Sequence, residues 1–380
     1  MDMSAHRPTP PGDRVFLFLQ GPHGPFFHAL ARMLRVAGSK VWRVGFNAGD
    51  RAFWFDPDSY IPFQDTQAAW PAFFRIARSL GISIHVFEEG YIRPYWVTYE
   101  RGGSNGHSRL MEMSVAEMRA ALKLSDMDAP EPPARWGDMR QHIFYGALYH
   151  WFVMFRNRSY ANFRPHRDLP VTQEFQLYLR RLVTMPWHAI ERRIAQWRIR
   201  NGGFPYHLAL LQLEHDSSFR NHSPFTSMSE FLDVVIRGFA QGAPAHHRLV
   251  IKAHPLENGR VPLAGEIRRI AREAGITRRV HFVSGGKLAQ LLTDARSAVT
   301  VNSTAAQQVL WRGIPLKVFG QAVYAKAEFV SDQPLQARLS GLPPLSAGNQ
   351  PDTGRLLLDA RTPPVAAAGG RYDAVRRRPL

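Results

Sequence analysis

Carboxylates, a lysine–histidine pair and a group of hydroxyl side chains each follow a predicted strand, at the point where the strand ends. The three segments are Glu88-Glu89-Gly90, Lys252-Ala253-His254-Pro255 and Asn302-Ser303-Thr304. In open α/β sheets, the carboxyl ends of the strands border the crevice that binds ligands. We therefore expect these side chains to face one cleft. Carboxylates together with cationic side chains suit a negatively charged substrate whose bond is broken by acid–base chemistry.

The carboxylates could act as a catalytic pair. Adjacent residues on a strand point to opposite faces, so only one of Glu88 and Glu89 can enter the cleft. Burial or a nearby like charge would raise the pKa of that carboxyl group enough for general acid–base catalysis. Asp216, which follows a predicted strand at residues 206–213, could supply a second carboxylate. Two carboxylates of separate origin suit glycosyl transfer, one as nucleophile and one as acid/base. The alternatives are surface acids at a strand end and an Asx-turn at Asp216.

Lys252 and His254 stand two residues apart, so on an extended strand end their side chains project the same way. Pro255 holds His254 in an extended conformation. A lysine and a histidine that converge on one point suit a phosphate, since histidine can change its protonation state near neutral pH. The alternative is a structural histidine with satisfied hydrogen bonds.

Asn302, Ser303 and Thr304 lie where a predicted strand gives way to a helix that continues to about Gly313. All three residue types are preferred helix N-caps. The same geometry can bind an anionic oxygen, because N–H groups at a helix N-terminus are exposed. Both roles remain open at this position.

The composition restricts the classes of partner and site. The chain has 380 residues, a formal net charge of +17 and no cysteine. Absence of cysteine excludes disulfides, thiolate metal sites and cysteine nucleophiles. The pair His246-His247 lacks carboxylate company, so we expect no metal site. The positive charge favours nucleic acid, acidic lipid or a charged sugar nucleotide, and no nucleic-acid-binding motif is present.

Neither a signal peptide nor a transmembrane helix is expected. Residues 1–13 are polar and rich in proline, and no stretch approaches about 18 uninterrupted apolar residues. The absence of cysteine fits a protein of the reducing cytoplasm.

Short apolar runs alternate with segments of helical period along most of the chain. In the first half we expect helices at residues 26–37 and 69–80 and strands at 14–20, 40–46 and 83–87. In the second half we expect helices at 228–239, 264–274 and 287–295 and strands at 206–213, 248–253, 280–284, 298–301 and 316–319. This alternation predicts an α/β protein with a Rossmann-type parallel sheet in each half.

Basic helical material separates the two halves. Residues 144–167 mix aromatic side chains with arginines, which suits a membrane interface, whereas a buried aromatic face between domains is the alternative. After the second half the sequence loses its periodic apolar face, which predicts a disordered tail. We predict four parts: an acceptor-side Rossmann-like domain, a helical connecting segment, a nucleotide-sugar-binding Rossmann-like domain and an irregular tail, at residues 14–135, 136–203, 204–330 and 334–380.

Six segments resemble one known family. They are Leu19-Gln20-Gly21-Pro22-His23-Gly24-Pro25-Phe26-Phe27, Phe46-Asn47-Ala48-Gly49-Asp50, Val86-Phe87-Glu88-Glu89-Gly90-Tyr91-Ile92-Arg93-Pro94, Asn221-His222-Ser223-Pro224-Phe225, Ile251-Lys252-Ala253-His254-Pro255 and Val301-Asn302-Ser303-Thr304. On these segments the chain resembles capsule polysaccharide biosynthesis/export proteins of the KpsS/LipB type. This is a family of retaining β-Kdo glycosyltransferases, in which Kdo is 3-deoxy-manno-octulosonic acid.

The resemblance implies a GT-B-like fold, two Rossmann-type domains facing a central cleft. It implies CMP-Kdo as donor substrate, no separate cofactor and a phosphatidylglycerol-type lipid acceptor at the cytoplasmic face of the inner membrane. Other capsule assembly proteins are expected partners, and nucleic acid is not. The basic, aromatic segment would suit docking on anionic lipid.

The resemblance also implies roles for individual residues. Asp216 resembles the family's nucleophile and Glu89 its acid/base, with the choice between Glu88 and Glu89 open. The nucleotide sugar would contact a second group, Lys252, His254, Pro255, Asn302, Ser303 and Thr304. The acceptor and its loop would contact Gly21, His23 and Arg93.

Two departures from the family pattern bear on activity. Residues 78–83 run directly into the strand that precedes Glu88, as though one strand–helix unit were missing. The closing helices of the family are replaced by an irregular C-terminal tail. The alternative hypothesis is therefore a catalytically inactive, membrane-associated component of capsule biosynthesis or export.

Overall fold

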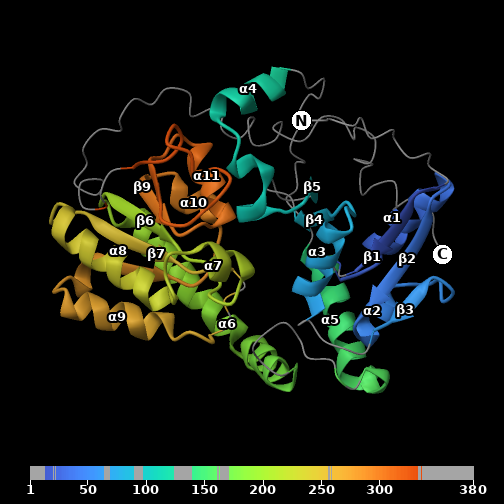
Figure 1. Ribbon diagram of the computed structural model, residues 1–380. Helices are drawn as coiled ribbons and strands as arrows, with labels where there is room; N and C mark the ends of the chain where they lie inside the picture. The colour runs from blue at the N-terminus through green and yellow to red at the C-terminus, as the bar shows by residue number, and fades with distance from the viewer. Residues whose placement is uncertain are drawn as a thin grey trace. The chain divides into compact units, whose positions relative to one another are not determined.

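The computed structural model describes residues 13–19, 21, 23–63, 69–89, 97–123, 139–160, 162, 171–255, 257, 259–332 and 335. Contacts divide the chain into two compact units. Unit 1 comprises residues 1–83 and 135–176, and unit 2 comprises residues 84–134 and 177–380. Each unit contains a parallel sheet (Figure 1), so the predicted α/β fold with two Rossmann-type halves is confirmed. This grouping differs from the predicted domain ranges, which stay predictions, and the predicted tail lies outside the described residues apart from Leu335.

Unit 1 is built on three parallel strands in the order β1-β2-β3. In chain order its elements are β1 (Val15–Phe18), α1 (Phe26–Val36), β2 (Lys40–Gly45), α2 (Ala48–Ala52), β3 (Tyr60–Pro62), α3 (Ala69–Ser79) and α5 (Met139–Phe155). The apolar face of α1 packs Phe27 and Ala31 into the unit. The sequence did not predict β3, because three residues are too few to show a strand period.

Unit 2 contains a five-stranded parallel sheet in the order β10-β9-β6-β7-β8. Its strands are β6 (Tyr206–Leu210), β7 (Arg248–Lys252), β8 (Val280–Val283), β9 (Ala295–Thr300) and β10 (Leu316–Val318). The chain adds β7 and β8 on one side of β6 and then returns to add β9 and β10 on the other. Between β6 and β9 the sheet therefore has a topological switch point, where doubly wound sheets bind ligands.

Helices cover both faces of this sheet. The helices of unit 2 are α4 (Val115–Lys123), the C-terminal part of α6 (Val171–Asn201), α7 (Ser217–His222), α8 (Met228–Gly242), α9 (Leu263–Glu273), α10 (Leu288–Leu292) and α11 (Gln307–Leu310). Successive side chains of a strand point to opposite faces of the sheet. Leu208 and Leu210 of β6 therefore lie in one hydrophobic cluster, and Ala209 lies in another. The segment predicted to be helical, 136–203, contains α5 and α6. Within the described residues, no helix combines the length and apolarity needed to cross a membrane.

One predicted strand does not join a parallel sheet. β4 (His85–Glu89) pairs antiparallel with β5 (Val97–Arg101), with Glu88 opposite Thr98. The connection between them is too short for a crossover, since a parallel pair needs about a dozen residues or more in its connection. The prediction that this strand belongs to a Rossmann-type parallel sheet is therefore wrong.

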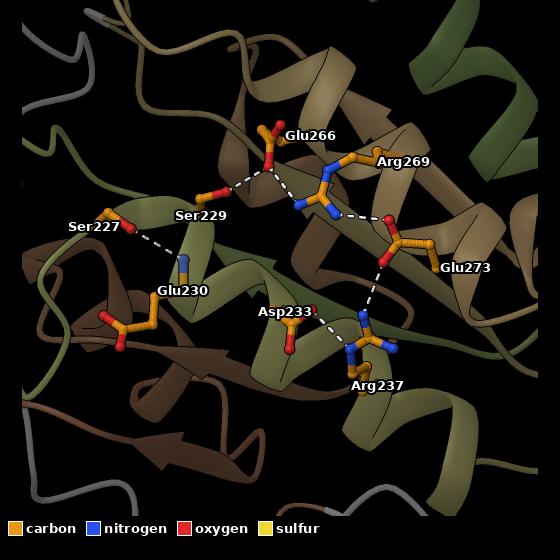
Figure 2. A network of polar contacts seen from close by, with 8 residues as sticks. All are labelled: Ser227, Ser229, Glu230, Asp233, Arg237, Glu266, Arg269 and Glu273. Carbon is orange, nitrogen blue, oxygen red and sulfur yellow. Dashed lines mark hydrogen bonds and ion pairs between the residues drawn. The ribbon is translucent and has the colours of Figure 1, made fainter.

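Charged side chains join α8 to α9 on the surface of unit 2 (Figure 2). The Arg237 guanidinium lies 2.7 Å from the carboxylate of Asp233 and 2.9 Å from that of Glu273. Arg269 contacts Glu273 at 2.7 Å and Glu266 at 2.9 Å. Water screens these exposed pairs, so they orient the two helices more than they stabilise the fold.

A buried histidine pair should make unit 2 sensitive to acid. His207 Nε2 lies 2.9 Å from His247 Nδ1, near the amino ends of β6 and β7. Burial, and then the charges of His246, Arg296 and Arg279, lower the pKa of His247 below its ordinary value of 6.5. The folded protein therefore binds this proton less readily than the unfolded chain, and stability falls as the pH drops below about 6.5.

We expect His247→Gln to reduce the loss of stability between pH 7.5 and pH 5.5. Urea unfolding at both pH values measures the change in midpoint. His246→Gln, at the exposed neighbouring position, should keep most of the wild-type pH dependence. Equal pH dependence in His247→Gln and wild type would show that His247 does not cause the acid sensitivity.

Candidate functional site

A small hollow lies at the switch point of the unit 2 sheet. It is lined by side chains and backbone from the ends of β9 and β10, from α7 and from the turn after β5: Asn105, Gly106, Ser218, His222, Asn302, Thr304, Gln307, Gln321, Ala322, Val323 and Tyr324. Its volume is about 20 Å³, room for about one water molecule. A larger ligand would lie over this hollow rather than inside it.

Asn302 joins the carboxyl ends of β9 and β6. Its Oδ1 accepts a hydrogen bond from Gln212 Nε2 at 2.6 Å, and its backbone N–H donates to Gln212 Oε1 at 3.2 Å. The Asn302 Nδ2 group donates to the carbonyl oxygens of Ser218 at 2.8 Å and His222 at 3.3 Å. Both amide hydrogens are used, so Asn302 positions α7 against the strand ends.

Ser303 and Thr304 begin the short 3₁₀ helix Thr304–Ala306. Ser303 Oγ accepts a hydrogen bond from Ala305 N at 3.3 Å, so the capping interpretation is confirmed for this residue. The Ser303 carbonyl accepts from the buried hydroxyl of Tyr324 at 2.6 Å. Thr304 lines the hollow. An anion contact at Ser303 and Thr304 stays a prediction.

Gln307 is an unusual lining residue. It is 1% exposed, and neither its Oε1 nor its Nε2 has a hydrogen-bond partner among the described residues. An unsatisfied buried amide costs about 1–3 kcal/mol per polar group, so such groups in native proteins call for an explanation. A water or a ligand group in the hollow would satisfy this amide.

Asp216 is exposed immediately before α7, at the carboxyl-end side of β6. Ser217 Oγ lies 3.5 Å from Asp216 Oδ1, and the Asp216 side chain does not cap α7. Ser218, two residues further, lines the hollow. The predicted nucleophile is therefore held beside the switch point with its carboxylate open to solvent.

Glu88 is connected to the same hollow by a hydrogen bond with Asn105. Asn105 Nδ2 donates to Glu88 Oε2 at 2.7 Å, and Asn105 itself lines the hollow. Asn105 has a positive φ of 53°, which asparagine tolerates better than most residues. The next residue, Gly106, approaches α7 so closely that a Cβ there would lie 2.3 Å from His222 Nδ1. The turn after β5 thus brings Glu88 and α7 to one site within unit 2.

His222 packs between that turn and the end of β9. Its ring meets the His107 ring edge to face at 4.8 Å. Burial, followed by the charge of His107, lowers the pKa of His222. A largely neutral imidazole at neutral pH can accept or donate one hydrogen bond beside a ligand.

Lys252 is the last residue of β7 and His254 follows that strand, on the other side of β6 from Thr304. Because neighbouring strands lie about 4.8 Å apart, the ends of β7 and β9 are separated by about 10 Å. Lys252 is 5% exposed, His254 is half-buried and Pro255 is exposed. The prediction that these residues and Ser303–Thr304 bind one nucleotide sugar remains untested.

In unit 1, His23 stacks on Tyr149 with ring centroids 4.2 Å apart. A Cβ at Gly21 would lie 2.2 Å from the Phe27 ring, so this glycine permits close packing. Asn47, in another family segment, caps α2 and donates to the Tyr149 hydroxyl at 2.6 Å. These observations give Gly21 and Asn47 structural roles. Arg93 and the side chain of Glu89 lie outside the described residues.

Several site residues were given no role from the sequence. Gln212, His222, Asn105 and Gln307 meet at the switch point although they come from four separate segments. A polar residue shortly after a buried strand is the signal that could have found one of them, since Gln212 stands two residues after β6. Among the described residues, no group of three histidine, aspartate or glutamate side chains is placed to hold a metal ion.

The strand order and the hollow define a class of protein: an α/β protein with a candidate ligand site at the switch point of a doubly wound sheet. The sequence profile described as "Capsule polysaccharide biosynthesis protein" matches residues 59–344. The chain is 30% identical to "Capsule polysaccharide export protein KpsS" from Escherichia coli over 337 residues, covering 82% of this chain and 86% of that protein. It is also 30% identical to "Capsule polysaccharide modification protein LipB" from Neisseria meningitidis serogroup A, covering 81% and 80%.

The chain therefore belongs to the capsule polysaccharide biosynthesis protein family, which confirms the resemblance seen in the sequence motifs. Among solved structures it is similar to "Thermosulfurimonas dismutans KpsC, beta Kdo 2,4 transferase", with a TM-score of 0.40 and 12% identity. That superposition covers 87% of this chain and 90% of the other. The superposition is loose, and the fold assignment rests on the strand order described above.

Proposed function

We propose that this protein is a glycosyltransferase that moves Kdo from CMP-Kdo to a phosphatidylglycerol-type lipid acceptor during synthesis of the capsule linker, with retained configuration. Family membership supports the role in capsule biosynthesis. The observation that carries the chemistry is that Asp216 and Glu88 both adjoin residues lining the hollow at the switch point. Two carboxylates beside one ligand site are what retaining glycosyl transfer requires.

In the proposed reaction, the Asp216 carboxylate attacks the anomeric carbon of Kdo and the bond to the CMP phosphate breaks. CMP leaves with the electron pair of that bond. The hydroxyl oxygen of the acceptor then attacks the anomeric carbon and displaces Asp216. A glutamate, Glu89 or Glu88, accepts the proton of that hydroxyl group. Two displacements at the anomeric carbon retain its configuration.

The charged groups at the strand ends would bind the leaving nucleotide. Lys252 and His254 lie at the end of β7, and the N–H groups and hydroxyls of Ser303 and Thr304 lie at the end of β9. Developing negative charge on CMP would be stabilised by these donors. No separate cofactor is needed for this reaction.

Transfer of Kdo to a phosphatidylglycerol analogue tests the proposal. The purified protein, fresh CMP-Kdo and the lipid should give a Kdo–lipid product that mass spectrometry detects. Lipid binding without any product would instead favour the alternative, an inactive membrane-associated capsule component.

Docking at the inner face of the inner membrane is part of the proposal. α6 exposes four large apolar side chains at positions 187, 190, 194 and 197, a spacing that places them on one helix face: Trp187 (66% exposed), Ile190 (51%), Ile194 (45%) and Trp197 (65%). Exposed arginines at positions 198 and 200 follow in the last turn. An aromatic and aliphatic face beside arginines suits the interface of an anionic membrane.

We expect Trp187→Ser combined with Trp197→Ser to weaken binding to phosphatidylglycerol vesicles about tenfold or more, because two interfacial aromatic rings are lost. Vesicle co-sedimentation measures the affinity. Val234→Ser, at an exposed position on α8, is the matched control and should bind as wild type does. Unchanged binding by the double variant would exclude this face of α6 as the membrane contact.

A further inference from the structure

Lys252 is a buried cation in an unfavourable setting. Lys252 is 5% exposed. Its ammonium group donates a hydrogen bond to the Ala253 carbonyl oxygen at 3.3 Å. Burial, and then the positive charge of Arg192, lower the pKa of Lys252 to about 8. A buried positive charge beside another positive charge destabilises the fold unless an anion compensates it.

The second feature is the inward face of α6. Arg192, Gln196 and Ile199 follow one another at helical spacing, and Ile199 is 3% exposed in the hydrophobic cluster of unit 2. Gln196 Nε2 is buried and has no hydrogen-bond acceptor among the described residues. Burying apolar side chains on this face would cost less free energy than burying polar ones. An arginine and an unsatisfied amide at these positions therefore need another explanation.

The third feature is the diglycine turn after β8. Gly285 and Gly286 have φ angles of 80° and 84°, which favour glycine. A Cβ at Gly286 would lie 2.3 Å from Gln196 Nε2 and 3.1 Å from Arg192 Cδ. A Cβ at Gly285 would lie 3.7 Å from Arg192 Nη1. The turn therefore leaves room for both side chains of α6 against its backbone.

The sheet register places this turn beside Lys252. Lys252 of β7 is paired with Val283 of β8, and Ala253 N donates to the Val283 carbonyl at 2.9 Å. Gly285 follows Val283 by two residues, so the ends of β7 and β8 meet the inward face of α6. The ammonium, the guanidinium and the amide N–H groups are all hydrogen-bond donors.

We propose that Lys252, Arg192 and Gln196 form an oxyanion subsite that binds the carboxylate or the phosphate of an anionic sugar-nucleotide donor. The inference rests on the proposed function, in which the donor is an anionic sugar nucleotide. The subsite adds residues of α6 to the donor site. The subsite is separate from the hollow, because β6 lies between β7 and β9. A donor with two anionic groups could occupy both places.

Calorimetric titration of the full chain at pH 8 tests the subsite, with CMP, free Kdo and inorganic phosphate as probes. We expect Arg192→Gln to weaken binding of at least one probe about tenfold or more, since a hydrogen bond to a charged group is lost. Arg193→Gln, at the exposed neighbouring position on α6, is the matched control and should bind as wild type does. Weaker CMP and phosphate binding identifies the phosphate as the occupant, and weaker Kdo binding identifies the carboxylate.

Proton uptake provides a second readout. Because the pKa of Lys252 lies at about 8, part of these side chains is neutral at pH 8; a bound anion raises that pKa, so binding should be accompanied by proton uptake. Titrations in buffers of different ionisation enthalpy measure this uptake, and it should vanish in Lys252→Met. Wild-type protein that binds no probe, or binds without proton uptake, would overturn the subsite.

Thermal unfolding separates a binding role from a structural one. Lys252→Met removes a buried positive charge, and Gln196→Leu removes a buried amide N–H group without an acceptor among the described residues, so we expect raised melting temperatures together with weakened anion binding. Equal binding by Arg192→Gln and wild type overturns the subsite even if Kdo transfer is normal. Loss of binding in Arg192→Gln without any Kdo transfer by wild type supports the subsite and contradicts the transferase proposal.

Discussion

Replacing Asp216 by asparagine should reduce Kdo transfer at least about a thousandfold, because an amide cannot act as the nucleophile. The substitution keeps the size of the side chain, and the Asp216 side chain makes no capping hydrogen bond to α7. The fold and CMP affinity should therefore be close to those of wild type. Initial rates of transfer to a phosphatidylglycerol analogue, with calorimetry of CMP binding, separate the chemical step from binding.

The matched control for this experiment is Asp233→Asn, which changes a carboxylate on α8 that is 42% exposed and paired with Arg237. Its transfer rate should stay within about twofold of wild type, since loss of a surface ion pair changes little. Glu88→Gln and Glu89→Gln then identify the acid/base, because only one of them should show a comparable loss. A wild-type rate in Asp216→Asn would exclude this residue as nucleophile.

Replacing Asn302 by alanine should destabilise unit 2 by about 2–4 kcal/mol. Asn302 is 6% exposed and makes side-chain hydrogen bonds to Gln212, Ser218 and His222. Alanine would leave the buried Gln212 amide and two carbonyl oxygens without these partners. The midpoint of urea unfolding measures the effect.

Asn221→Ala, at an exposed position on α7, serves as the control for Asn302→Ala and should unfold within about 0.5 kcal/mol of wild type. In addition, Asn302→Ala should weaken CMP binding, because the ends of β6 and β9 are no longer joined. A variant as stable as wild type would contradict the role of Asn302 in positioning the switch point.

The strands and helices of unit 2 could be predicted from the sequence because their signals are local. β7 is a short apolar run whose residues 249–251 are fully buried, and α8 repeats its apolar residues at helical spacing. The carboxyl ends of such strands are where ligand-binding residues follow, which is why the Lys252, Asp216 and Ser303 segments were identified.

The partner of β4 and the contacts between loops could not be predicted in this way. Strand periodicity does not say which strand is the neighbour, and β4 pairs with the next strand instead of joining a parallel sheet. The hydrogen bond from Asn105 to Glu88 depends on a turn with positive φ, which sequence spacing alone does not indicate. The inward position of Arg192 and Gln196 could have been predicted, because helical spacing places them on the same face of the helix as the apolar residue Ile199.

The sequence therefore predicts the segments that carry the site but not which of their residues lie together. The sequence indicated which strand ends carry reactive side chains, whereas in the structure Thr304 lines the hollow of unit 2, Glu88 is hydrogen-bonded to the lining residue Asn105, and Asp216 stands two residues before the lining residue Ser218. Sequence alone placed Glu88 and Asp216 on opposite domains of a two-domain enzyme. The contacts instead group residues 84–134 with the second sheet, because the turn after β5 packs on α7.

The most direct test of the central claim, that the switch point of the unit 2 sheet is the donor site, is hydrogen–deuterium exchange with and without CMP. We expect protection at residues 212–222, 252–255 and 300–307 on addition of CMP, and no change at residues 15–63 of unit 1. Protection confined to unit 1, or no protection at the ends of β6, β7 and β9 under saturating CMP, would contradict the claim.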